Sequence, residues 1–215
     1  MKAVIIANGD IRDYEFVRQI LADFVGYDYV LACDGGLRHC HVLGVVPDHI
    51  VGDLDSAPQD ILEKYRDVPL LQFSPEKDQT DLELAITFSC DKGADSITIL
   101  GGLGGRFDHQ LANVHVLVQA VERHVKAELR DEHTRIRLIN DCCKIKLHKQ
   151  DGALVTLLPF TNAAEGIETE GLQYPLKSER LSIGFARGVS NQIIDEWAAV
   201  SLKKGMLLVI QTNEL

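Results

Sequence analysis

Short apolar runs alternate with amphipathic stretches through the first half of the chain, and this alternation constrains the fold more than any other feature. The apolar runs predict strands at residues 3–7, 29–33, 49–51, 70–73 and 96–100. The stretches between them predict helices over 13–25, 36–43, 58–65, 80–92 and from 108 to about 123. Strands that alternate with helices form a parallel sheet covered on both faces. We therefore expect an α/β domain with a mostly parallel, Rossmann-like sheet, whose right-handed crossovers place every strand's C-terminal end at one edge.

The second half changes character and becomes rich in short β-type segments. These predict strands at 134–139, 143–148, 153–159, 164–172, 181–185, 188–194 and 205–211. Turn residues separate them at intervals that suit a sandwich or a barrel. The change in element type falls near residues 124–134, so the sequence predicts two domains, 1–128 and 129–215.

Composition and charge exclude several classes of protein. Of the 215 residues 46% are hydrophobic and 25% are charged, which is typical of a folded soluble domain and not of a disordered one. The net charge of −10 belongs to residues 1–125, and residues 126–215 are neutral overall. So acidic a half repels a nucleic-acid backbone, and no apolar stretch is long enough to span a bilayer. We expect a cytoplasmic protein with no nucleic-acid or membrane partner, whose five cysteines, none in a CxxC pair, are buried reduced thiols.

Four loops that follow predicted strands carry aspartate, glycine or both. They are DGG at 34–36, GDLDS at 52–56, SPEKDQTD at 74–81 and GGLGGRFDH at 101–109. In open α/β sheets the ligand crevice lies outside the carboxyl ends of the strands. The sequence therefore predicts that these four loops converge on one site.

Two of these loops contain paired aspartates. Asp53 and Asp55 point the same way in an extended segment, and their like charges repel unless a cation such as Mg²⁺ lies between them. An Asx turn or a helix cap is an equally ordinary use of the same residues. Asp78 and Asp81 stand where a helix starts, so either Asp78 or Thr80 can cap that helix.

The glycine-rich loop is suited to phosphate. Glycines allow the backbone amides to approach a phosphate closely, the helix that follows adds its N-terminal dipole, and Arg106 can make a bidentate contact. A tight strand-to-helix turn without a ligand is the alternative. The loop is neither a Walker A sequence nor a GxGxxG fingerprint.

Six segments together resemble the thiamine pyrophosphokinase family. They are CDGG at 33–36, PDHIVGDLDS at 47–56, KDQTDLE at 77–83, GGLGGRFDHQLAN at 101–113, EGLQYPL at 170–176 and GVSNQ at 188–192. The resemblance implies an α/β catalytic domain that binds ATP and Mg²⁺, a C-terminal β-sandwich that binds thiamine, and a homodimer with active clefts between subunits. It also implies that diphosphate passes from ATP to the hydroxyl of thiamine, which gives thiamine diphosphate and AMP.

The same resemblance assigns roles to individual residues. Asp53, Asp55, Asp78 and Asp81 would form the catalytic acidic cluster that handles Mg²⁺ and the diphosphate. The nucleotide side would be built from Asp34, Gly35, Lys77, Gln79, Thr80, Gly102, Gly105, Arg106, Asp108 and Asn113. Tyr174, Ser190 and Asn191 would contact thiamine, and Arg187 departs from the small hydroxyl residue expected beside them. Two other readings stay open: a pyrophosphokinase for another alcohol such as a pterin, and a non-catalytic sensor of thiamine diphosphate or nucleotide.

Overall fold

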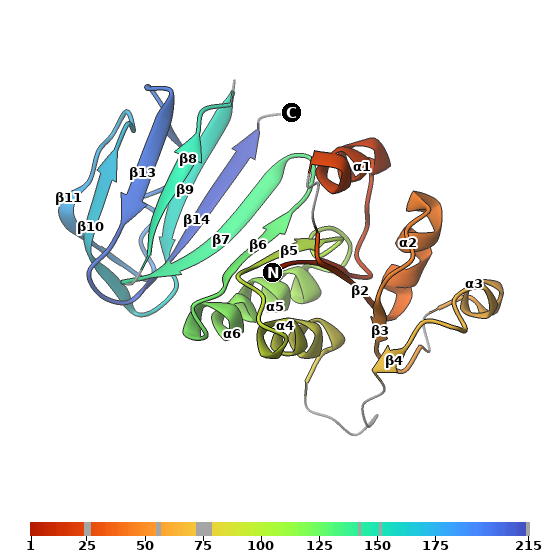
Figure 1. The fold of residues 1–215 in the computed structure, drawn as a ribbon. Helices are drawn as coiled ribbons and strands as arrows, with labels where there is room; N and C mark the ends of the chain where they lie inside the picture. The colour runs from red at the N-terminus through yellow and green to blue at the C-terminus, as the bar shows by residue number, and fades with distance from the viewer. Residues whose placement is uncertain (24–26, 55–56, 72–78, 142, 151, 214–215) are drawn as a thin grey trace. The chain divides into compact units, whose positions relative to one another are not determined.

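The computed structural model describes residues 1–23, 27–54, 57–71, 79–141, 143–150 and 152–213. The chain separates into two compact units, Met1–Glu132 and His133–Leu215, which are described one at a time. The boundary between the two units along the chain falls within residues 124–134, where the sequence changes character. Figure 1 labels the helices and strands of both.

The first unit is an α/β fold, as the sequence predicted. Its strands are β1 (Lys2–Ile6), β2 (Tyr29–Cys33), β3 (His49–Val51), β4 (Leu70–Leu71), β5 (Ser96–Leu100) and β6 (Lys126–Arg130). Its helices are α1 (Tyr14–Asp23), α2 (Leu37–Leu43), α3 (Gln59–Lys64), α4 (Asp81–Asp91), α5 (Phe107–His115) and α6 (Leu117–Glu122), and a 3₁₀ turn η1 covers Asp34–Gly36. Within this unit the strand order is β6-β5-β1-β2-β3-β4, and each adjacent pair is parallel.

Helices cover both faces of this parallel sheet, which explains why its strands read as continuous apolar runs. On one face Val4 and Ile6 of β1 pack in a core with residues of α1, α2 and α3, among them Val17, Leu37 and Ile61. Helices α4, α5 and α6 lie along the other face (Figure 1). Residues Ala3–Ile6 are all buried, as expected for a central strand of a parallel sheet.

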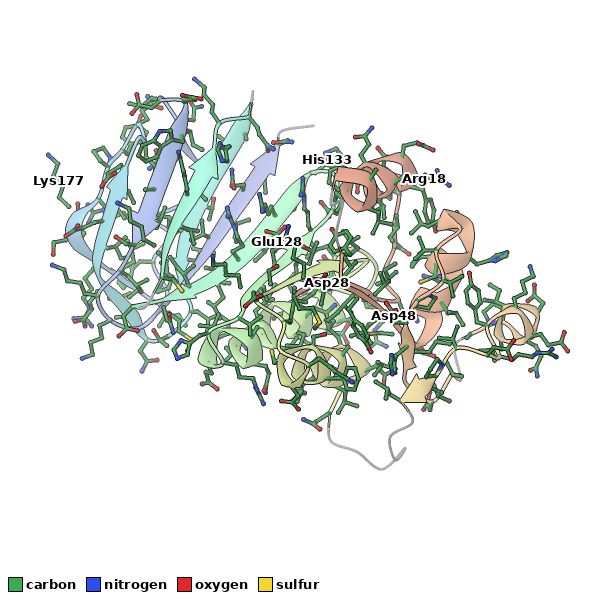
Figure 2. All side chains as sticks on the ribbon, in the orientation of Figure 1. Arg18, Asp28, Asp48, Glu128, His133 and Lys177 are labelled. Carbon is green, nitrogen blue, oxygen red and sulfur yellow. The ribbon has the colours of Figure 1, made fainter. Side chains whose placement is uncertain are left out.

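Some acidic residues of the first unit serve the sheet itself. Asp28 and Asp48, both labelled in Figure 2, precede β2 and β3. Their carboxylates accept hydrogen bonds of 2.8 and 2.7 Å from the backbone N–H groups of Lys2 and Val30. They lie at the N-terminal ends of the strands, so their charge contributes to the net −10 without reaching the opposite edge of the sheet.

The second unit is all-β, which confirms the fold class predicted for it. One antiparallel sheet has the order β12-β9-β14-β7, and the other has the order β11-β10-β13-β8. The strands are β7 (Thr134–Asn140), β8 (Lys144–His148), β9 (Ala153–Pro159), β10 (Ala163–Glu170), β11 (Lys177–Ser182), β12 (Asn191–Gln192), β13 (Trp197–Ser201) and β14 (Met206–Asn213). Residues from both sheets, such as Leu147, Val155 and Val209, share one hydrophobic core, and burial alternates along β9 as it does in a sandwich.

The structure corrects several predicted elements. The single helix predicted from 108 is two helices that meet at Val116, and the strands β6 and β13 were missed. The strand predicted over 188–194 is only Asn191–Gln192, because Ser190 adopts a φ of 60°, which is incompatible with extended backbone. The strand predicted over 181–185 is wrong in its bounds, since β11 ends at Ser182.

The structure also bears on the predicted burial of the cysteines and on the length of the helices. In the described part of the chain Cys33 and Cys40 are buried thiols, as predicted, whereas Cys90 and Cys143 are only half-buried thiols. Cys142 lies outside the described residues. None of the helices that the structure describes has the length and apolar character needed to cross a bilayer.

Candidate functional site

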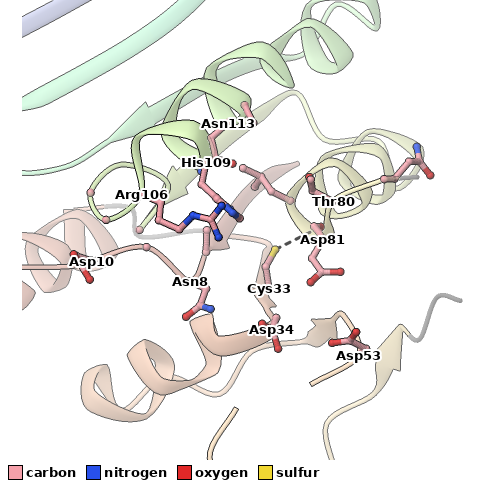
Figure 3. A pocket seen from close by; sticks show the side chains of 18 residues that line it. Asn8, Asp10, Cys33, Asp34, Asp53, Thr80, Asp81, Arg106, His109 and Asn113 are labelled. Atoms are coloured by element: carbon pink, nitrogen blue, oxygen red, sulfur yellow. Dashed lines mark hydrogen bonds between the residues drawn. The ribbon is translucent and has the colours of Figure 1, made fainter. Parts of the chain in front are cut away.

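A cavity of about 600 Å³ opens at the C-terminal ends of the parallel strands in the first unit (Figure 3). Its walls come from the loops after β1, β2, β3 and β5, from residues 79–82 at the start of α4, and from α5. The lining residues are Ala7, Asn8, Gly9, Asp10, Cys33, Asp34, Asp53, Gln79, Thr80, Asp81, Leu82, Gly101, Gly104, Gly105, Arg106, His109, Ala112 and Asn113. The predicted convergence of separate loops at one edge of the sheet is confirmed for the described residues.

The order of the strands explains why the cavity lies where it does. From β1 the chain adds β2, β3 and β4 on one side, and β5 and β6 then lie on the other side of β1. The direction of winding therefore reverses between β1 and β5. Such a reversal leaves a crevice between the two strand ends, which is where open α/β sheets bind ligands.

The loops after β1 and β5 contact each other backbone to backbone across this crevice. The N–H of Gly9 donates a 2.7 Å hydrogen bond to the carbonyl oxygen of Gly101. A Cβ on Gly9 would lie 2.4 Å from that oxygen, so only glycine permits the approach. Gly101, Gly104 and Gly105, the glycine wall of the cavity, have φ values of 65°, 91° and 76°. The glycine-rich loop thus follows a path that residues with a Cβ rarely adopt.

Three carboxylates gather on the opposite side of the cavity and form its acidic wall, which consists of Asp34, Asp53 and Asp81 (Figure 3). Asp34 is buried in η1 directly after β2, and it has a φ of 45°. Gly52 lies between these side chains: a Cβ there would be 3.0 Å from Oδ2 of Asp81 and 3.2 Å from Cβ of Asp34. Asp34 and Asp81 therefore approach each other around a position that only hydrogen occupies, and Asp53 follows Gly52 in the chain.

No three His, Cys, Asp or Glu side chains of the described residues form a group that could hold a metal ion by themselves. Asp55 and Asp78, two of the four metal ligands predicted from the sequence, lie outside those residues, as does Lys77. Mg²⁺ in nucleotide sites is commonly held by one or two carboxylates, water and substrate phosphates instead of a closed protein cage. Asp53 and Asp81 supply donors of that kind to the cavity.

The first turn of α4 is fixed by side-chain contacts. Thr80 caps the helix, because its Oγ1 accepts a 3.2 Å hydrogen bond from the N–H of Glu83. The carboxylate of Glu83 accepts hydrogen bonds from Nε2 of Gln79 at 3.2 Å and from Nε2 of Gln119 at 3.4 Å. This network orients Gln79 and places Asp81 at the positive end of the helix dipole.

Arg106 enters the cavity from the end of the glycine-rich loop (Figure 3). Its guanidinium donates to both carboxylate oxygens of Asp108, with Nε–Oδ1 at 3.1 Å and Nη2–Oδ2 at 2.6 Å. These hydrogen bonds hold the pKa of the Asp108 carboxyl below its usual range and raise the pKa of Arg106. Asn113 Nδ2 donates to the carbonyl oxygen of Gly102 at 2.7 Å, which ties the same loop to α5.

The structure brings together most of the described nucleotide-side residues predicted from the sequence. Those that line the cavity are Asp34, Gln79, Thr80, Gly105, Arg106 and Asn113, beside Asp53 and Asp81. Gly35, Gly102 and Asp108 do not line it. Gly35 packs against the side chain of Asn8, since a Cβ there would lie 2.3 Å from Asn8 Oδ1. Gly102 and Asp108 act through the hydrogen bonds just described.

Sequence reasoning missed the loop after β1, which contributes Asn8, Gly9 and Asp10 to the cavity. The signal was present, because this loop also follows a strand and carries both glycine and aspartate. His109, near the start of α5, also lines the cavity.

The residues predicted to contact thiamine belong to the second unit. Tyr174 and Asn191 line a cavity of about 130 Å³, together with Arg187. Asn191 is buried and holds the Tyr174 backbone at both of its polar groups: its Oδ1 accepts from the N–H at 3.1 Å, and its Nδ2 donates to the carbonyl oxygen at 2.8 Å. Ser190 does not line this cavity, and its N–H donates to Oγ1 of Thr156 at 3.1 Å.

Comparison with known protein families shows to which family the chain belongs. Residues 24–129 match the model of the thiamin pyrophosphokinase catalytic domain, and residues 142–207 match that of the thiamin pyrophosphokinase vitamin B1 binding domain. The chain belongs to the thiamine pyrophosphokinase family. The resemblance of the six sequence segments is thereby confirmed.

Individual thiamine pyrophosphokinases align over much of the chain. The thiamine pyrophosphokinase of Bacillus subtilis (strain 168) is 28% identical over 204 residues, which cover 92% of this chain and 95% of that protein. Thiamine pyrophosphokinase 1 of Arabidopsis thaliana is 29% identical over 188 residues, 78% of this chain and 66% of the plant protein. The bacterial relative therefore shares the two-domain extent of this chain, and the plant relative has additional sequence.

Solved structures of thiamine pyrophosphokinases share the fold. The crystal structure of the Bacillus subtilis protein superposes with a TM-score of 0.89 at 26% identity and covers 100% of both chains. The yeast thiamin pyrophosphokinase superposes with a TM-score of 0.77 and covers 98% of this chain and 86% of the yeast chain. At 19% identity the yeast protein shows the likeness of the fold alone.

Proposed function

We propose that this chain is an Mg²⁺-dependent thiamine pyrophosphokinase, which transfers the terminal diphosphate of ATP to the hydroxyl of thiamine and releases AMP. The observation that carries the proposal is the cavity at the reversal between β1 and β5, which has an acidic wall and a glycine wall. It occurs in a chain that has both domains of the family.

The glycine wall and Arg106 suit the phosphates of ATP. Positive φ values at Gly104 and Gly105 leave the loop backbone open to close approach by a ligand. The guanidinium of Arg106 is exposed and presents a planar set of donors that matches phosphate oxygens. Its present partner Asp108 is equally exposed, so exchange of that carboxylate for a phosphate costs little.

The acidic wall suits Mg²⁺, for which Asp53 and Asp81 would be ligands together with Asp55 and Asp78. Carboxylate oxygens are the donors that this hard cation prefers, and Gly52 leaves the space between Asp34 and Asp81 free of a side chain. Mg²⁺, when bound, neutralises charge on the phosphate oxygens and on the departing AMP.

The remaining chemistry needs positioning and one proton acceptor. The thiamine hydroxyl oxygen forms a bond to the β-phosphorus, the bond from that phosphorus to the oxygen bridging to the α-phosphate breaks, and AMP leaves with the bond's electrons. Asp78 or Asp81 would orient the hydroxyl and accept its proton. Positioning of the two substrates and neutralisation of charge together account for most of the rate in transfers of this kind.

Thiamine would be contacted by Tyr174, Ser190 and Asn191. The pair of hydrogen bonds from Asn191 fixes the backbone of Tyr174, whose side chain is 66% exposed and therefore free to meet an aromatic ligand. Cationic thiamine is attracted to the strongly negative charge of the first unit, which is consistent with thiamine as the substrate.

We further propose a homodimer with active clefts between subunits, on the strength of the family resemblance. A cytoplasmic location stays a prediction.

A steady-state assay of AMP release tests the function against its two rivals. Purified protein with Mg²⁺ and ATP should release AMP only when thiamine is added, and an equimolar amount of thiamine diphosphate should appear. Release that depends on a pterin alcohol instead would assign another acceptor. Binding of thiamine diphosphate or nucleotide without any AMP release would identify a sensor, and either result would overturn the proposal.

A further inference from the structure

A buried imidazole outside the cavity joins three segments of the first unit. His39, on α2, is 3% exposed. Its Nε2 lies 2.8 Å from the carbonyl oxygen of Gly9, and its Nδ1 lies 2.7 Å from the hydroxyl of Tyr14 on α1. The residue therefore connects α1, α2 and the loop after β1, and neither the family motifs nor the proposed chemistry gives it a role.

The two contacts fix the tautomer of the ring. A carbonyl oxygen can only accept, so Nε2 carries a hydrogen and donates it to Gly9. The Nε of Arg38 lies 3.4 Å from the same nitrogen, but the shorter contact to an obligatory acceptor decides the assignment. In the neutral ring Nδ1 is then an acceptor, and the Tyr14 hydroxyl donates to it. Both nitrogens are satisfied without a charge.

His39 holds the loop after β1, and this loop contacts the glycine wall across the crevice. Gly9 lines the cavity between Asn8 and Asp10, and its N–H binds the Gly101 carbonyl of the glycine wall. The neighbouring Arg38 adds a 2.9 Å hydrogen bond from Nη2 to the carbonyl oxygen of Asn8. A shift of the Gly9 peptide would therefore move the contact between the two loops at the strand reversal.

We propose that His39 is a positioning residue that sets the shape of the nucleotide side of the cavity through its hydrogen bond to the Gly9 carbonyl. The proposal rests on the proposed function for its kinetic readout. It predicts a specific pattern: loss of the donor at Nε2 weakens the use of ATP, and the use of thiamine changes little, because the residues expected to contact thiamine belong to the second unit.

Two substitutions at the same position separate the donor from the bulk of the ring. The amide nitrogen of glutamine in His39→Gln can reach the place of Nε2 and donate to Gly9, whereas His39→Leu fills similar space with no donor. We expect His39→Leu to raise the KM for ATP about tenfold, since it leaves the Gly9 carbonyl without the donor that lies 2.8 Å away. His39→Gln should stay within about threefold of the wild type for the same reason.

Cys40→Ala is the matched control for stability. Cys40 is the next residue on α2, is fully buried and packs in the core on that face of the sheet, away from the Gly9 carbonyl. Its truncation lowers the free energy of unfolding without touching the loop. A raised KM for ATP in Cys40→Ala, or an unchanged KM in His39→Leu, would show that His39 only stabilises the fold and would overturn the proposal.

The pH dependence of stability gives a readout independent of turnover. Burial lowers the pKa of His39, with Arg38 lowering it further and the Gly9 carbonyl and Asp10 raising it. Because the unfolded chain binds the proton more readily, this residue's contribution is complete above about pH 6.5 and is lost as the pH falls toward the lower folded pKa. As the pH falls below about 6.5, the free energy of unfolding of His39→Gln should therefore decrease less than that of the wild type.

Measurements of binding keep this proposal distinct from the proposed function. If the wild type shows no thiamine-dependent AMP release, the proposed function fails, and calorimetric titration of a non-hydrolysable ATP analogue into the same variants still tests His39. Should His39→Leu not fold, Tyr14→Phe replaces it: loss of the partner of Nδ1 should weaken analogue binding by a smaller factor, and His39→Gln should bind as the wild type does. Equal affinity in Tyr14→Phe and the wild type, or weak binding by His39→Gln, would contradict the proposal.

Discussion

Replacement of Asp81 by asparagine should lower kcat by a factor of about a hundred or more, with little change in the fold. Asp81 lines the cavity in the first turn of α4, and its carboxylate is within reach of the space beside Gly52. The amide keeps the shape of the side chain but removes the negative charge that would bind Mg²⁺ and orient the acceptor hydroxyl, and it replaces one acceptor oxygen by a donor. Loss of a catalytic carboxylate costs about 10²–10⁴ in rate in comparable enzymes.

The measurement is steady-state AMP release at saturating ATP, thiamine and Mg²⁺, together with thermal unfolding. Asp60→Asn is the matched control, because Asp60 is also an acidic residue in the first turn of a helix, α3, but is exposed and outside the cavity. Each substitution removes a favourable charge from a helix N-terminus and should cost about 0.3–1 kcal/mol of stability. Asp53→Asn should behave like Asp81→Asn. A kcat for Asp81→Asn similar to that of Asp60→Asn would refute the assignment.

Gly52→Ala is the second substitution expected to have a large effect, with kcat falling at least tenfold. Gly52 has a φ of 137°, where a residue with a side chain is strained by about 1–3 kcal/mol. The new Cβ would also lie 3.0 Å from the Asp81 carboxylate and 3.2 Å from Cβ of Asp34, so the acidic wall would have to move. Catalytic groups must be held within about 0.5 Å of their productive positions, and a misplacement of about 1 Å can cost about 10²-fold in rate.

Gly93→Ala separates backbone strain from this displacement. Gly93 also has a positive φ, 83°, but nothing lies within 4 Å of an added Cβ. Gly93→Ala should therefore lose stability and retain the wild-type kcat, whereas Gly52→Ala should have both a lower stability and a lower kcat. If the two variants keep the same kcat, the packing of Asp34 and Asp81 around Gly52 has no bearing on the reaction.

The sequence predicted three of the loops that form this site, but it did not predict the residues elsewhere in the chain that contact these loops. The loops after β2, β3 and β5 could be found because each follows an apolar run and carries aspartate or glycine, and the edge at which they meet follows from parallel topology alone. The α4 cap at Thr80 was one of two candidates, and local chemistry could not choose between it and Asp78.

The loop after β1 carries the same signal as the other loops, glycine and aspartate after an apolar run, but its contact with the glycine wall does not follow from that signal. Its importance depends on the reversal of strand order between β1 and β5, and strand order is set by long-range packing that a single sequence does not display. The same holds for His39, which meets Gly9 across 30 positions of the chain. A buried histidine with two satisfied nitrogens has no signature in composition or spacing.

The misplaced elements have local causes. The sequence of α5 and α6 is helical throughout, and the break at Val116 has no glycine or proline to announce it. Strand β13 contains Ala198 and Ala199, whose small side chains carry little β-type signal although both are buried in the second unit.

A crystal structure with thiamine, Mg²⁺ and a non-hydrolysable ATP analogue would show where the triphosphate and the cation bind. We predict that the phosphates lie between the glycine wall and the acidic wall, with the cation bound by carboxylates that include Asp53 or Asp81. A triphosphate bound elsewhere on the chain, or a cation with neither aspartate among its ligands, would contradict it.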